Sequence, residues 1–138
     1  MRAFSLWQPM GTALIDGGKP WENRPRRTHV RGLVIVHAAA REEETGYYSA
    51  MHRWWPNWWH YPRPRGCLLG IVNLIDCKHI DEVRGEPWAY GPWCWRVELV
   101  MKFDTPIPFK GKQGFFNVPG SILPDSVEEV IQRHQVAA

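Results

Sequence analysis

The stretch CLLGIVNLIDC, residues 67–77, carries apolar side chains at nearly every position. Successive side chains of a strand point to opposite faces, so this segment predicts a core strand that is covered on both faces. The stretch WCWRVELVMKFD, residues 93–104, instead alternates apolar and polar residues. That alternation predicts an antiparallel strand with one buried face.

Shorter strands and helices are expected around these two segments. Further strands are predicted at residues 3–7, 32–40 and 115–118, and helices at residues 8–18, 41–55 and 123–134. The absence of a regular alternation of strands and helices argues against a doubly wound sheet. We therefore predict a mainly β (α+β) fold: a small β-barrel of five or six strands with two or three short peripheral helices.

The length of 138 residues predicts a single domain over residues 1–138. No apolar run approaches the roughly 18 residues that a membrane span needs, and no signal peptide is evident, so a cytoplasmic location without membrane contact is expected. Three cysteines without zinc or redox spacing are expected to be small core residues. Six histidines without metal-binding spacing predict no metal site, and we expect no cofactor.

Positive charge is concentrated in residues 19–31, where Glu22 is the only acid beside five cationic residues. Twelve of the seventeen cationic residues of the chain are arginines. Arginine suits bidentate contact with phosphate and stacking on rings. Arg24, Arg26, Arg27 and Arg31 therefore form either a solvated face or a track for the phosphates of a nucleic acid.

Lys19 and Glu22 are candidate site residues within this segment. Residues three apart on a strand point to opposite faces, but a bend at Pro20 would let these two side chains converge. Such a pair has three interpretations: it contacts a ligand, it acts in catalysis as base or nucleophile, or it is a structural ion pair. The sequence leaves all three open.

The stretch RWWPNWWHYPRPR, residues 53–65, is the most unusual part of the chain. Its four tryptophans and one tyrosine cannot all lie on one side of a short element. Exposed rings beside arginines would form a platform on which unpaired bases stack. The alternative is a hydrophobic cluster beneath a long loop.

Four segments, in this order, resemble the ASCH (activating-signal-cointegrator homology) domain family. The first is SLWQPMGTALIDGGKPWENRP, residues 5–25, with the spacing G-x-K-x-x-E-x-R. The others are LVIVHAA, residues 33–39, GCLLGIVNLIDC, residues 66–77, and PIPFKGKQGFFNVP, residues 106–119. Within this family the chain resembles the small, EOLA-like proteins.

This resemblance implies a PUA-like β-barrel, a fold that typically binds RNA. It also implies an enzymatic alternative, because one branch of small relatives deacetylates N4-acetylcytidine and another is described as cleaving RNA. The motif of the deacetylating branch has threonine where this sequence has Glu22. In the hydrolase hypothesis Lys19 would be the nucleophile or base and Glu22 the proton shuttle.

Our prediction is a protein that binds RNA, another single-stranded nucleic acid or a nucleotide in a basic, aromatic-rimmed cleft beside the first helix. The alternatives are the hydrolase and a protein-interaction domain that uses its tryptophan-rich loop. Gln8 and Pro9 would lie at the amino end of that helix, where backbone N–H groups suit an anion or a carbonyl. Lys110 and Lys112 are placed near the cleft by the resemblance, although ordinary turn chemistry also explains them. The predicted binding residues are Trp7, Gln8, Pro9, Trp21, Arg24, Arg26, Arg27, Lys110 and Lys112.

Overall fold

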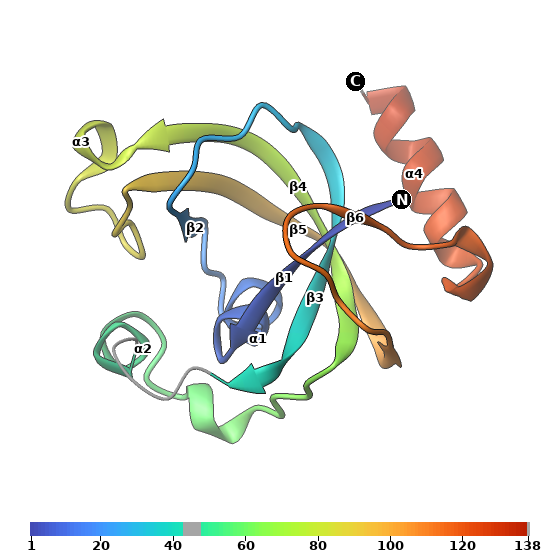
Figure 1. The fold of residues 1–138 in the computed structure, drawn as a ribbon, viewed down its shortest axis with the longest axis horizontal. Helices are drawn as coiled ribbons and strands as arrows, with labels where there is room; N and C mark the ends of the chain where they lie inside the picture. Colours follow the sequence, from blue (N-terminus) through green and yellow to red (C-terminus); the bar gives the residue numbers. More distant parts are fainter. Residues whose placement is uncertain (43–47, 138) are drawn as a thin grey trace.

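A computed structural model of the chain describes residues 1–42 and 48–137. Six strands form one curved sheet in the order β2-β5-β4-β3-β1-β6 (Figure 1). The strands are β1 (Arg2–Gln8), β2 (Trp21–Arg24), β3 (Gly32–Glu42), β4 (Cys67–His79), β5 (Trp93–Pro108) and β6 (Phe116–Asn117). The helices are α1 (Met10–Ile15), α2 (Tyr48–Trp54), α3 (Ile80–Val83) and α4 (Ser126–Ala137), with 3-10 helices at Trp58–His60 and Gly120–Ile122.

β4 lies inside the sheet and is covered on both faces, as its sequence predicts. Leu69 and Val72 belong to the main core, which also contains α1. Leu68 and Ile71 belong to a second core on the opposite face. There α4 packs through Val127, and Figure 1 shows this helix outside the curved sheet.

β5 is longer than predicted and does not keep the alternation of its sequence. Leu99, expected on the buried face, is 50% exposed. The cause lies in the pairing with β4, whose register shifts at three places, one of them between Ile71 and Val72. A bulge adds an unpaired residue, so side chains beyond it change faces.

The edges of the sheet are β2 and β6, so the barrel is not closed. β1 pairs in parallel with β3, and every other pairing is antiparallel. The prediction of a mainly β fold, a small barrel of five or six strands, is confirmed, with six strands in a sheet that stays open. It has four short α-helices where two or three were expected.

The first and last predicted helices are found as α1 and α4, with narrower bounds for the first. The helix predicted over residues 41–55 is shorter, because β3 runs to Glu42 and α2 begins at Tyr48; residues 43–47 lie outside the described part. Among the described residues, no helix is long and apolar enough to cross a membrane.

Candidate functional site

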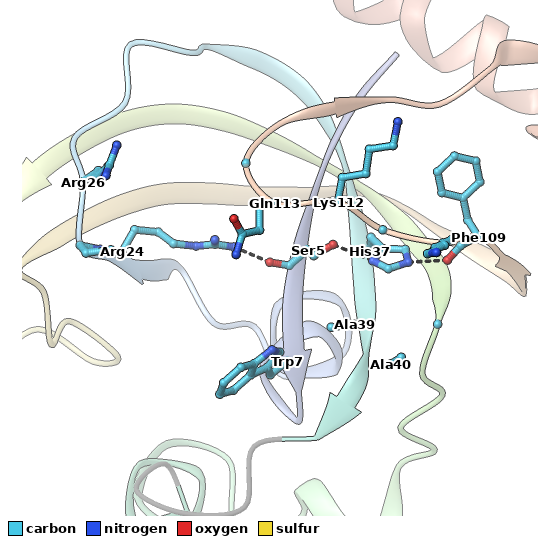
Figure 2. Close-up of a pocket in the computed structure, with 15 residues that line it drawn as sticks. Ser5, Trp7, Arg24, Arg26, His37, Ala39, Ala40, Phe109, Lys112 and Gln113 are labelled. Carbon is cyan, nitrogen blue, oxygen red and sulfur yellow. Dashed lines mark hydrogen bonds between the residues drawn. The ribbon is translucent and has the colours of Figure 1, made fainter.

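A cavity of about 920 Å³ lies between β1, β3 and the segment 109–114. Its cationic side chains are Arg24, Arg26, Lys110 and Lys112, and no carboxylate is found among the lining residues of the described part of the chain. The remaining lining residues are Ser5, Trp7, Pro25, His37, Ala39, Ala40, Gly66, Phe109, Gly111, Gln113 and Gly114 (Figure 2). A cavity with this lining favours an anionic ligand.

Strand pairing sets the floor of the cavity. The parallel register of β1 and β3 places Ser5 opposite His37. Ser5 and Trp7 are two residues apart on β1, so both side chains lie on the cavity side. The Trp7 ring is 49% exposed at the rim.

The segment 109–114 passes closely over this floor. A Cβ atom on Gly111 would lie 2.5 Å from both Ser5 Oγ and His37 Cε1, which is closer than atoms can approach. Glycine is therefore the residue that lets the main chain lie directly over the Ser5–His37 pair. Lys110 and Lys112, on either side of it, are exposed.

Arg24 is fixed by four contacts and still faces the cavity. Its Nε donates to Glu22 Oε2 at 3.0 Å, and its Nη2 donates to the Ser5 carbonyl oxygen at 2.6 Å. The guanidinium lies over the rings of Phe4 and Trp95, at 5.3 and 5.4 Å from their centroids. These contacts leave the side chain 25% exposed in one defined orientation.

Lys19 and Glu22 meet behind Arg24, in the interior. Lys19 Nζ donates to Glu22 Oε1 at 2.8 Å, and the two side chains are 1% and 8% exposed. Burial disfavours the charged carboxylate, but Lys19 and Arg24 together outweigh it and hold the pKa of Glu22 below its ordinary value of 4.5. Neither residue is among those that line the cavity.

Ser5 and His37 form a second polar contact that the sequence analysis did not single out. Ser5 Oγ lies 2.8 Å from His37 Nδ1, and His37 Nε2 lies 2.6 Å from the Phe109 carbonyl oxygen. A carbonyl only accepts, so Nε2 carries the proton and Nδ1 accepts from the serine hydroxyl. Burial lowers the pKa of His37, and the Phe109 carbonyl partly opposes this effect.

The other predicted binding residues are divided between the cavity and the interior. Gln8 is buried and bonds to Thr12 and to the Pro64 carbonyl oxygen, and Pro9 is buried before α1. Neither lines the cavity.

Trp21 is buried beneath Arg96, and its Nε1 has no hydrogen-bond partner among the described residues. Arg26 lines the cavity, whereas its neighbour Arg27 lies over the Trp93 ring and does not. The structure thus brings together Trp7, Arg24, Arg26, Lys110 and Lys112 of the predicted set.

The tryptophan-rich loop contains both buried and exposed rings. Trp58 is buried, and Trp54 donates from Nε1 to the Tyr90 hydroxyl at 2.9 Å. Trp59 and Tyr61 are 69% and 38% exposed. No group of three or more His, Cys, Asp or Glu side chains within residues 1–42 and 48–137 is placed to hold a metal ion.

Comparison with known proteins agrees with this architecture. Activating signal cointegrator 1 of Homo sapiens is 34% identical in an alignment 84 residues long, and the match covers 54% of this chain and 14% of the human protein. The crystal structure of ASCH from Zymomonas mobilis superposes with a TM-score of 0.54 at 13% identity, covering 96% of this chain and 93% of that one, and so shares the fold. The model of the ASCH domain matches residues 4–107, more than half of the chain. The chain therefore belongs to the ASCH domain family.

Proposed function

We propose that the cavity binds a nucleotide, alone or within single-stranded RNA. The observation that carries this proposal is the set of four cationic side chains beside an exposed tryptophan, with no carboxylate among the described lining residues. Phosphates and bases are the two groups that such a lining recognises. ASCH family membership supports the same class of ligand.

Each part of the lining has a distinct role in this proposal. Lys110, Lys112 and Arg26 are exposed and contact phosphates. Trp7 stacks on a base, which is worth roughly 1–3 kcal/mol. Arg24 keeps Nη1 free of hydrogen-bond partners among the described residues, so this group can donate to a base edge or a phosphate oxygen.

Lys19 and Glu22 act indirectly in this proposal. Glu22 accepts from both Lys19 and Arg24, so it orients the guanidinium that faces the cavity. The hypothesis that the two residues hydrolyse a modified nucleoside stays a prediction. Turnover of N4-acetylcytidine by the wild type, and its loss in Lys19→Ala, would support it.

The salt dependence of RNA binding tests the proposal. A fluorescein-labelled single-stranded RNA of mixed sequence is titrated with the protein at several salt concentrations. Arg26→Ala combined with Lys112→Ala should weaken binding and reduce the slope of log K against log salt by about 0.7 for each lost contact. Trp7→Ala should weaken binding with little change of slope.

Arg27→Ala is the matched control, because it removes a neighbouring arginine that does not line the cavity. Its binding curve and slope should stay near those of the wild type. A wild-type protein that does not bind RNA or nucleotides would refute the proposal. An unchanged slope in the double variant would refute the assignment of these two residues to phosphates.

A further inference from the structure

Ser5 and His37 combine three features that together activate a serine. The hydroxyl lies 2.8 Å from His37 Nδ1, the opposite ring nitrogen is held by the Phe109 carbonyl, and both side chains line the cavity (Figure 2). An adjacent base that is itself oriented by a third group is the arrangement that makes a serine nucleophilic. Neither residue is needed for the binding of phosphates proposed above.

We propose that Ser5 and His37 are a nucleophile and its general base, and that the cavity hydrolyses a carboxylic ester of a phosphate-bearing molecule. This activity goes beyond nucleotide binding. The cationic side chains hold the anionic part of the substrate, and the ester reaches Ser5 from the cavity that this side chain lines.

The chemistry balances with water as the only co-reactant. Ser5 Oγ forms a bond to the ester carbon while its proton moves to His37 Nδ1. The alkoxide leaves with that proton, and an acyl group remains on Ser5. Water then attacks the acyl carbon and gives its proton to Nδ1, after which Oγ departs and takes the proton back. The products are a carboxylic acid and an alcohol.

The ring is prepared for this proton transfer. Burial keeps His37 neutral, so Nδ1 is free to accept a proton at neutral pH. The Phe109 carbonyl fixes the tautomer and also stabilises the imidazolium that forms. The side chain is 2% exposed, so its orientation is set by its surroundings.

We assign the donors for the oxyanion to the segment that lies over the pair. The N–H groups of Lys110, Gly111 and Lys112 make no hydrogen bond within the described residues. Gly111 lies against Ser5 Oγ, so the main chain of this segment is next to a carbonyl attached to the serine. Such donors stabilise the negative charge of the tetrahedral intermediate.

The test is covalent labelling of the full chain with a fluorophosphonate. In this reaction Ser5 Oγ bonds to phosphorus, fluoride leaves and the proton passes to His37. We expect one label, located on Ser5 by peptide mass spectrometry. Ser5→Ala should abolish it, and the control Ser121→Ala, an exposed serine, should not.

His37→Gln keeps a donor and an acceptor at this position but removes the base. It should slow labelling about 100-fold or more, with thermal unfolding used to confirm that the variant is folded. A structural Ser5–His37 bond would not produce this loss. An unlabelled Ser5 in the wild type, or a label that forms equally fast in His37→Gln, would overturn the proposal.

RNA binding is measured on the same samples, so the two proposals can fail separately. Binding without labelling would overturn the nucleophile and leave the binding site. Labelling without binding would leave the nucleophile and refute the nucleotide site.

Discussion

Two polar pairs, Lys19–Glu22 in the interior and Ser5–His37 at the cavity, are connected through Arg24 and the main chain of Ser5. At one end of this connection, Lys19 and Glu22 are both charged. At the other, Ser5 and His37 are neutral. Arg24 joins them, because it donates to Glu22 through Nε and to the Ser5 carbonyl through Nη2.

The difference shows what burial does to a titratable group when its partners differ. Burial disfavours the charged form in both cases. Glu22 stays ionised because two cations contact it, whereas His37 is contacted by a hydroxyl and a carbonyl, which carry no net charge. The charged end is therefore suited to fixing Arg24, and the neutral end to accepting a proton.

A substitution in the Lys19–Glu22 pair should cause the largest loss of stability. Glu22→Gln leaves Lys19 buried and without a carboxylate, and breaking a buried pair in this way costs about 3–5 kcal/mol. Urea denaturation at pH 7 measures this loss. The variant should also bind RNA less tightly, because Arg24 loses the group that orients it.

Asp16→Asn is the matched control, since it also changes an acid to its amide. Asp16 pairs with Lys102 at 2.7 Å, but the lysine side chain is 56% exposed. An exposed pair contributes about 0.2–1 kcal/mol. Equal losses in the two variants would contradict the distinction between a buried and an exposed ion pair.

The sequence predicted the fold well because its strands have strong patterns. Residues 67–77 are apolar on both faces and form a strand covered on both sides. The convergence of Lys19 and Glu22 was also predictable, since Pro20 permits the bend that it requires. The exposure of Leu99 was not, because bulges depend on the partner strand.

The Ser5–His37 pair could not be predicted from local spacing. The two residues are 32 positions apart and meet through the register of parallel strands, and the third member is a backbone carbonyl of Phe109. The available signal was the His-Ala ending of the strand at residues 33–39, which the resemblance included without a role for the histidine.

A substitution of Gly111, which lies over the Ser5–His37 pair, should cause an intermediate loss of stability. Gly111→Ala would place a methyl group against Ser5 Oγ and His37, so the segment must lift from the floor of the cavity. We expect a loss of about 1–3 kcal/mol in urea denaturation, together with slower labelling of Ser5. Gly120→Ala is the control, because no atom lies within 4 Å of the added Cβ there. A variant as stable as this control would show that the segment does not pack against the pair.

The smallest effect is a dependence of stability on pH from His37. Its folded pKa lies below its ordinary value of 6.5, so below pH 6.5 the unfolded chain binds a proton that the folded chain does not. The free energy of unfolding therefore decreases as the pH is lowered through this range, by at most about 1.4 kcal/mol per pH unit. The decrease ends where the folded histidine is also protonated.

Glu22 makes the free energy of unfolding depend on pH in a more acidic range. Its contribution is complete above its ordinary pKa of 4.5 and is lost as pH falls through its lower folded value. His37→Gln should therefore flatten the slope just below pH 6.5 and leave the loss in stronger acid unchanged, as followed by urea denaturation from pH 8 downwards. His29→Gln replaces an exposed histidine and should leave both parts of the curve of unfolding free energy against pH unchanged. If His37→Gln kept the wild-type slope just below pH 6.5, His37 would not be the buried neutral group that accepts the proton of Ser5.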